Sequence, residues 1–201
     1  MKLRHRPGFT IVELLVVIVA ISILATVTIV GYRTVQMQAR DTQIRSAAEK
    51  FAGALELWSA KHNNTFPQGG SVTSGTLSTP DGPNGCTAGG TNGWANSNYA
   101  GTSLTYPCTV GQVMVYGGYL PADFFTKLPN NTRYNNNLTN YMVYRCYNDE
   151  FKRRLLLYAL EEPTQQERDT FASTLNSCGM SGSISTLEGY GMRALIEITF
   201  A

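Results

Sequence analysis

The sequence predicts an α+β chain, in which a long N-terminal α-helix with a membrane-spanning first half packs on a small antiparallel β-sheet domain. A run of 23 residues, 9–31, contains one charge and is long enough for a helix to cross roughly 30 Å of hydrocarbon. Residues 32–62 continue with helical periodicity, and residues 63–201 contain short β-type segments between turn signals. A chain of 201 residues has room for one globular domain beside the membrane helix.

The apolar run has a composition that favours a helix in lipid. Fourteen residues of 8–31 are β-branched, which disfavours a helix in water. In hydrocarbon the backbone has no alternative to internal hydrogen bonds, so a helix is predicted. An ordinary cleaved signal peptide is disfavoured, because the run is too long, carries a carboxylate and ends in only a weak cleavage site.

A short basic leader, residues 1–8, precedes the run. Its charges, Lys2, Arg4 and Arg6, favour an N-terminus that stays in the cytoplasm, which places the chain after Gly31 outside. The chain has 16 basic and 14 acidic side chains, so 13 basic ones remain without the leader. This near-neutral outer portion does not offer the broad basic surface that nucleic acids bind.

Glu13 is the costly residue of the apolar run. Near a helix end it costs less than the roughly +2.5 to +3.5 kcal/mol of a charge at the centre, but it still needs a partner. Either the carboxyl group reaches the headgroup layer or stays protonated, or it pairs with a positive charge that another molecule presents at the same depth. At about 4 Å and an effective dielectric constant of ~20, such a pair gains roughly 4 kcal/mol before desolvation.

These residues together resemble a known family. Gly8-Phe9-Thr10, with Glu13 as the fifth residue from Phe9, follows a basic leader and precedes a long apolar run, as in type IV prepilins and type II secretion pseudopilins. The resemblance implies a prepilin peptidase that cuts between Gly8 and Phe9 and methylates the new amino group of Phe9. It also implies that Glu13 pairs with the Phe9 amine of a neighbouring subunit as a filament grows.

Residues 32–62 are predicted to be an amphipathic continuation of the helix. Apolar residues recur at intervals of four and three, and this stripe is expected to dock on the chain's own domain while the charged residues point elsewhere. The stripe comprises Ile44, Ala48, Phe51, Leu55 and Trp58. Asn63, Asn64 and Pro67 are expected to end the helix after Lys61. Many pilins have a proline at the position of Val30; here Gly31 follows and weakens the helix by about 1 kcal/mol relative to alanine.

Residues 68–111 are predicted to form a long surface loop of the β-rich domain. The segment contains ten glycines, many Ser, Thr and Asn residues, and Asp81 as its only charge. Its aromatic residues, Trp94, Tyr99 and Tyr106, are either adhesive or folded onto the domain, and the second interpretation is favoured.

Four cysteines fall in the portion expected outside the cell, and an even count there indicates two disulfides with three possible connectivities. They are Cys86, Cys108, Cys146 and Cys178. Sequential pairing is the expected connectivity. None of them forms a C-x-x-C pair, and His5 and His62 are far apart, so neither a metal site nor a cofactor is expected.

The remaining elements are mostly strands. A short strand is predicted at 113–116 and a helical turn at 119–129. Two strands, 141–147 and 154–161, are expected to form a hairpin around the loop 148–152. The strand 193–201 alternates in polarity and is expected to place one face on the core.

Thr164 and Glu167 have the spacing of a capping box, which predicts a helix from residue 165 to about 175. The basic cluster Lys152, Arg153 and Arg154 is interpreted as a solvated hairpin turn rather than a contact with DNA or an acidic partner.

The chain shows no nucleophile elbow, phosphate-binding glycine loop or oriented carboxylate pair, so an enzyme is not expected. The resemblance implies a structural subunit of a type IV pilus, a homo-oligomeric surface filament for adhesion, twitching motility or DNA uptake. Its partners would be a prepilin peptidase and methyltransferase and a pilus assembly platform. Before assembly the chain would be a single-pass membrane protein with a cytoplasmic N-terminus. The alternatives are a pseudopilin of a type II secretion or competence system in the cell envelope, and a membrane-anchored surface domain that never polymerises.

Overall fold

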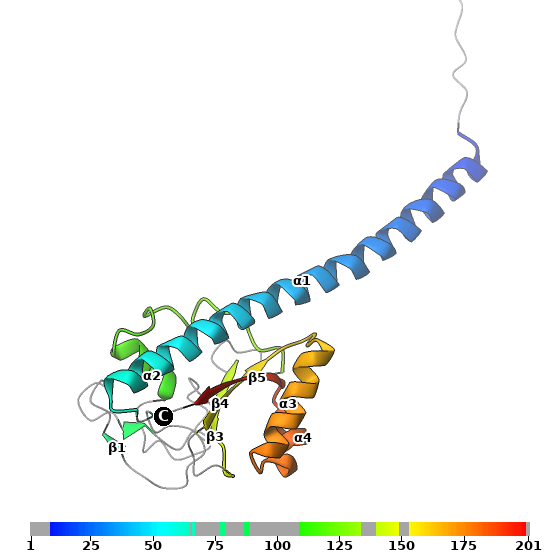
Figure 1. Cartoon of the computed structure of the whole chain (residues 1–201). Helices are drawn as coiled ribbons and strands as arrows, with labels where there is room; N and C mark the ends of the chain where they lie inside the picture. Colours follow the sequence, from blue (N-terminus) through cyan, green and yellow to red (C-terminus); the bar gives the residue numbers. More distant parts are fainter. Residues whose placement is uncertain are drawn as a thin grey trace, which may run out of the picture. The chain divides into compact units, whose positions relative to one another are not determined.

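The computed structural model describes residues 9–64, 66, 77–78, 87–88, 109–133, 140–148 and 153–199 (Figure 1). The chain divides into two compact units, Met1–Ala39 and Arg40–Ala201. The order of elements is α1 (Ile11–Lys61), β1 (Leu77–Ser78), β2 (Thr87–Ala88), α2 (Val110–Tyr116), β3 (Tyr141–Arg145), β4 (Arg153–Ala159), α3 (Gln165–Ser177), the 3-10 helix η2 (Ser181–Ser183), α4 (Ile184–Gly189) and β5 (Met192–Thr199).

The long helix predicted from the sequence is confirmed, since α1 continues from the apolar run to Lys61. Inside the apolar run, hydroxyl groups donate hydrogen bonds back to carbonyl oxygens of the same helix, for example Ser22 to Ile18 at 2.7 Å. The hydroxyl groups of Ser22, Thr26 and Thr28 thus need no partner outside the helix. After Lys61 the chain turns, because Asn63 and Asn64 both adopt a φ of 55°.

The second unit is built on a three-stranded antiparallel sheet in the order β3-β4-β5, which confirms the predicted hairpin and C-terminal strand (Figure 1). Residues 40–61 of α1 cover one face of the sheet, and α3 and α4 cover the other. The observed fold is therefore a long helix with a small antiparallel sheet, in the predicted α+β class. β1 and β2 pair inside the segment predicted as a surface loop.

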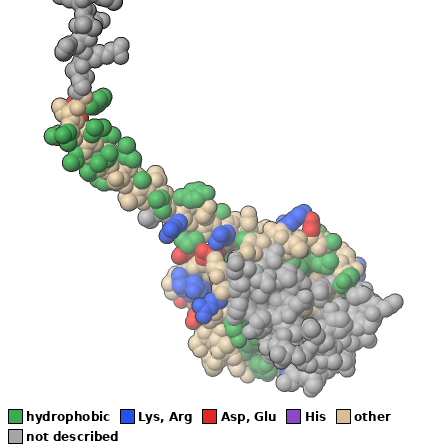
Figure 2. All heavy atoms as spheres, turned by 180° about the vertical axis from the view of Figure 1, so that it is seen from behind, with side chains coloured by type: hydrophobic (Ala, Val, Ile, Leu, Met, Phe, Trp, Pro, Cys, Tyr) green, Lys and Arg blue, Asp and Glu red, His purple; other side chains and the backbone are tan. Residues whose placement is uncertain are grey.

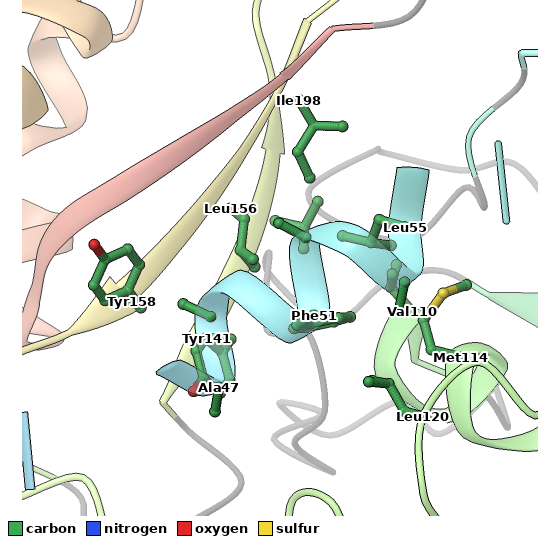
Figure 3. Packing of buried hydrophobic residues seen from close by; sticks show 14 of the residues in the cluster. Ala47, Phe51, Leu55, Val110, Met114, Leu120, Tyr141, Leu156, Tyr158 and Ile198 are labelled. Atoms are coloured by element: carbon green, nitrogen blue, oxygen red, sulfur yellow. The ribbon is translucent and has the colours of Figure 1, made fainter. Parts of the chain in front are cut away.

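The first hydrophobic core lies between α1 and the sheet (Figure 3). All five residues of the predicted stripe are buried, with exposed fractions of 3% or less. The Phe51 ring lies edge-on to the rings of Phe125 and Tyr141, at 5.5 and 5.7 Å between centroids. The Tyr141 hydroxyl donates to the Ile44 carbonyl oxygen at 3.0 Å, so its polar atom is satisfied in the core.

The second core lies on the other face of the sheet, against α3 and α4. Alternate residues of β4 divide between the two cores: Leu156 and Tyr158 belong to the first, Leu155 and Leu157 to the second. A strand buried on both faces explains why β4 is a nearly continuous apolar run.

β5, like β4, has residues in both cores, and this differs from its prediction. Ala194 and Ile198 are buried in the first core as expected, but Leu195 packs against the second. Met192 also belongs to the second core, because the register shifts between Tyr158 and Ala159 of β4. The expectation of a single core face is therefore wrong for this strand.

One disulfide joins the hairpin to α3. Cys146 follows β3, Cys178 is the residue after α3, and their sulfur atoms are 2.10 Å apart. The Tyr147 N–H donates to the Cys178 carbonyl oxygen at 3.0 Å beside the bridge. This bond is one of the two in the sequential pairing. Cys86 and Cys108, as well as the three aromatic residues of the predicted loop, lie outside the described residues.

The strand predicted at 113–116 is wrong, because this segment belongs to helix α2. The Val113 N–H donates to the Thr109 carbonyl oxygen at 3.1 Å. Val110, Val113 and Met114 are buried at i, i+3 and i+4, which is the spacing of one helix face. Burial of this face outweighs the strand propensity of the two valines.

The basic cluster also differs from its interpretation, within the residues that are described. Arg153 and Arg154 belong to β4 rather than to a solvated turn. Arg153 forms an ion pair with Glu197 at 3.1 Å, and the Arg154 guanidinium lies 5.2 Å from the centroid of the Phe66 ring. Lys152 is not among the described residues.

Candidate functional site

The first turn of α1 holds Glu13 in a reciprocal hydrogen-bond pattern with Thr10. The Thr10 N–H and hydroxyl both donate to Glu13 Oε2 at 2.8 Å, and the Glu13 N–H donates to the Thr10 hydroxyl oxygen at 3.3 Å. This is a capping box at the start of a helix. This box was not predicted, although the T-x-x-E spacing of residues 10–13 is its signal in the sequence.

The capping box leaves part of the carboxylate available. Both hydrogen bonds from Thr10 reach Oε2, and Glu13 Oε1 accepts no hydrogen bond within the described residues. A carboxylate has about four lone-pair positions, so Oε1 has room for a further donor. Phe9, whose amino group is the expected partner in a neighbouring copy, is 81% exposed. Gly8 lies outside the described residues.

The apolar residues that follow Glu13 are exposed around the whole helix. The large hydrophobic residues from Leu14 to Leu24 have exposed fractions between 49% and 66%. Figure 2 shows hydrophobic side chains on the visible face of this part of α1. Within the described part of the chain, α1 alone is long and apolar enough to cross a membrane. Such a surface needs lipid or protein around it.

The same residues match the prokaryotic N-terminal methylation motif, over residues 3–29. The chain carries the type IV pilin and pseudopilin signature. This pilin-type motif implies processing by a prepilin peptidase and assembly into pilus-type filaments. It fits a membrane-anchored protein that is later assembled in a filament, and it suggests a structural subunit rather than an enzyme. No curated protein and no solved structure matches the chain.

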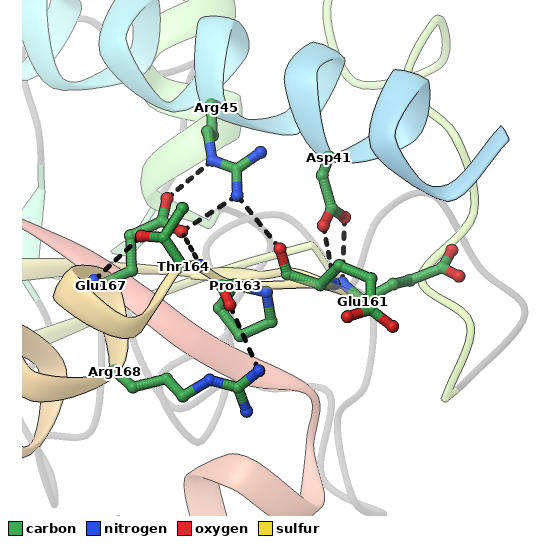
Figure 4. A network of polar contacts seen from close by, with 8 residues as sticks. Asp41, Arg45, Glu161, Pro163, Thr164, Glu167 and Arg168 are labelled. Carbon is green, nitrogen blue, oxygen red and sulfur yellow. Dashed lines mark hydrogen bonds and ion pairs between the residues drawn. The ribbon is translucent and has the colours of Figure 1, made fainter. Parts of the chain in front are cut away.

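The second unit has a polar anchor between α1 and the segment after β4, formed by Asp41, Arg45, Glu161, Glu162, Thr164 and Glu167 (Figure 4). The Asp41 side chain is 2% exposed. Its two carboxylate oxygens accept hydrogen bonds from the backbone N–H groups of Glu161 and Glu162, at 2.9 and 2.8 Å. The anchor fixes the helix to the sheet at the first residues of the second unit.

Arg45 completes the anchor one turn further along α1. Its guanidinium donates from Nε and Nη2 to the two carboxylate oxygens of Glu167, at 2.6 and 2.9 Å. Hydrogen bonds from Arg45 lower the pKa of the Glu167 carboxyl group, and bonds from Thr164 add to the effect. The same carboxylate raises the pKa of Arg45. Glu167 also closes the predicted capping box of α3, which is confirmed.

The charged residues of this stretch were expected to point away from the core, and for the buried Asp41 that prediction is wrong. The available signal was spacing, because Asp41 precedes Ile44 by three residues and Ala48 by seven. It therefore extends the buried stripe by one position. Its partners are backbone groups 120 residues away, which the sequence does not reveal.

Asp41→Ala is expected to lower the free energy of unfolding of the second unit by about 2–3 kcal/mol, because two part-buried N–H groups lose their charged acceptor. Chemical denaturation of the full chain in detergent, followed by near-UV circular dichroism, measures the loss. The control is Gln43→Ala, an exposed position on the same helix, which should change stability by less than about 0.5 kcal/mol. Equal stability of Asp41→Ala and the parent chain would show that the two hydrogen bonds to Asp41 contribute nothing to stability.

Acid should destabilise the parent chain more than Glu167→Gln. The folded-state pKa of Glu167 is lowered, so its contribution is present above the unfolded-state value and is lost as the pH falls below about 4.5. Glutamine can still close the capping box but cannot lose this charge. Thermal midpoints measured at stepwise lower pH should therefore converge for the two proteins. The control is Glu188→Gln, at an exposed position on α4, whose thermal midpoint should stay a constant difference away from that of the parent chain. The same convergence for Glu188→Gln would refute the assignment to Glu167.

Proposed function

We propose that this chain is a structural subunit of a type IV pilus. It is made as a membrane-anchored prepilin, cleaved between Gly8 and Phe9, methylated at Phe9 and polymerised through α1. The observation that carries the proposal is the methylation motif at 3–29, whose residues from Ile11 onward lie in α1, together with the exposure of the apolar run of α1 on all sides. No charge after Glu13 interrupts the run before Arg33, so the same surface suits lipid before assembly and packed helices after it.

Glu13 supplies the contact that orders the subunits in this proposal. In the single chain its Oε2 is occupied by Thr10, while Oε1 has no hydrogen-bond donor among the described residues. The positively charged amino group of Phe9 in a neighbouring copy is a suitable donor, because cleavage creates it four residues before Glu13. The pair aligns each helix with the next at one fixed depth.

Mass spectrometry of the mature protein purified from its native cell envelope tests this processing. The expected N-terminus is N-methylated Phe9. A mature chain that begins elsewhere, or that retains residues 1–8, would contradict the proposal. A strain without the prepilin peptidase is the control and should accumulate the uncleaved chain.

The type of filament is tested separately. Electron microscopy with antibodies to this chain should show long surface filaments built mainly of it, and deletion of its gene should remove them. Loss of protein secretion in the deletion strain, without any loss of surface filaments, would instead assign the chain to a secretion pseudopilus.

A further inference from the structure

The exposed surface of α1 in the second unit separates its charges into two sides. At about 100° per residue, Lys50 and Lys61 lie roughly 20° apart around the helix. Glu49 and Glu56 also lie roughly 20° apart, on a side about 100° or more away from the lysines. All four residues are exposed. We call the first side the basic flank and the second side the acidic flank.

The basic flank borders a groove between α1 and the segment 119–128. The groove has a volume of about 710 Å³. Its apolar lining includes Ala47, Leu120 and Phe124, and Lys50 and Lys127 also line it. Such a groove suits a partner that presents negatively charged side chains beside an apolar surface.

Lys127 is not fully neutralised within the chain. It forms an ion pair with Asp123, but 73% of its side chain remains exposed. Lys50 forms no side-chain ion pair within the described residues. The charged residues of the groove are Lys50, Lys127 and Asp123, so positive charges outnumber negative charges by two to one.

The acidic flank lies about 100° or more around the same helix from the basic flank. Arg45 is on this side too, but its guanidinium is bonded to Glu167 and to the Glu162 carbonyl oxygen. Glu49 and Glu56 form no side-chain ion pair within the described residues. The flank thus offers carboxylates to a positively charged partner.

We propose that the basic groove of one subunit receives the acidic flank of α1 from a second copy of this chain. The proposal rests on the filament function proposed above. Charge complementarity identifies the occupant, since a single chain carries both the basic groove and unpaired carboxylates on the other side of α1. Because the two surfaces differ, the contact is heterologous, and repeating it adds subunits without closing a two-fold dimer. It is a lateral contact, additional to the one at Glu13.

Charge reversal tests the contact. Lys50→Glu with Lys127→Glu, and separately Glu49→Lys with Glu56→Lys, are each expected to lower the yield of sheared filaments at least about fivefold, through two repulsive pairs. The variant with all four reversals should recover filaments to within about twofold of the parent chain, because complementarity is restored. Glu188→Lys, on α4 away from both surfaces, is the control and should leave the yield unchanged. No loss in either double variant, or no recovery in the fourfold variant, would overturn the proposal.

Cysteine crosslinking gives a second readout. Filaments of Glu49→Cys with Lys127→Cys, treated with a short bismaleimide, should yield a ladder of covalent multimers. Glu188→Cys with Lys127→Cys should yield none. A ladder absent from the first variant, or equally strong in the second, would reject this lateral contact. Filaments that form normally from the parent chain but ignore every charge reversal overturn this inference alone. A parent chain that never forms filaments overturns the proposed function.

Discussion

Glu13→Ala is expected to abolish filament assembly while the protein remains at normal abundance in the membrane. The carboxylate is the only acidic group of the apolar run, and its Oε1 atom accepts no hydrogen bond within the described residues. A net loss of about 2 kcal/mol per subunit contact weakens each contact roughly 30-fold, and every added subunit makes this contact. Immunoblots of sheared filaments and of membrane fractions measure assembly and abundance separately.

Glu13→Gln separates the charge of Glu13 from its capping role. Glutamine still accepts the hydrogen bonds of the capping box but has no charge to offer the Phe9 amine. The Glu13→Gln protein should therefore form no filaments, which is also the result expected for Glu13→Ala. Leu14→Ala, an exposed neighbour in the same turn, is the control and should assemble. Normal filaments from Glu13→Ala would show that assembly does not depend on the Glu13 carboxylate and would contradict its proposed role.

Phe51→Ala is expected to cost the second unit about 3–5 kcal/mol of its free energy of unfolding. Phe51 is fully buried and lies edge-on to Phe124, Phe125 and Tyr141, so its removal opens a cavity where α1 meets the sheet. Because a domain of this size is stable by only about 5–15 kcal/mol, much of the margin would be lost. Denaturant unfolding of the full chain in detergent gives the value.

Two further variants make the Phe51 result specific. Phe51→Leu keeps most of the volume and should cost less than half as much as alanine. Leu57→Ala removes a side chain that is 53% exposed on the same helix and should change stability by no more than about 0.5 kcal/mol. Equal losses at Phe51 and Leu57 would show that helix propensity, rather than the core, sets the effect.

The long helix could be predicted because it depends on local signals. The length of the apolar run and its single charge predict a helix that crosses lipid. The spacing of apolar residues alone identifies the buried stripe that includes Phe51 and Leu55. The capping box at Thr164 and Glu167 is equally local, and it placed the start of α3 correctly. In each case neighbouring residues supply the deciding interaction.

The failed predictions depend on contacts between distant residues. Val113 and its neighbours have strand propensity, but burial in the first core selects a helix. Asp41 looked like a surface charge, and only the segment after β4 supplies its N–H donors. The second core on the far face of the sheet was not predicted either, because the sequences of α3 and β5 taken separately do not show that these two elements pack together.

A cryo-electron map of native filaments would show directly whether α1 forms the filament core and whether Glu13 joins the subunits. We expect filaments built from this chain, with the α1 helices packed together along the axis and Glu13 of each subunit within hydrogen-bond distance of the methylated Phe9 amine of a neighbour. A map in which the apolar run of α1 lies on the outer surface, or in which Glu13 contacts no neighbouring amine, would refute the proposed assembly.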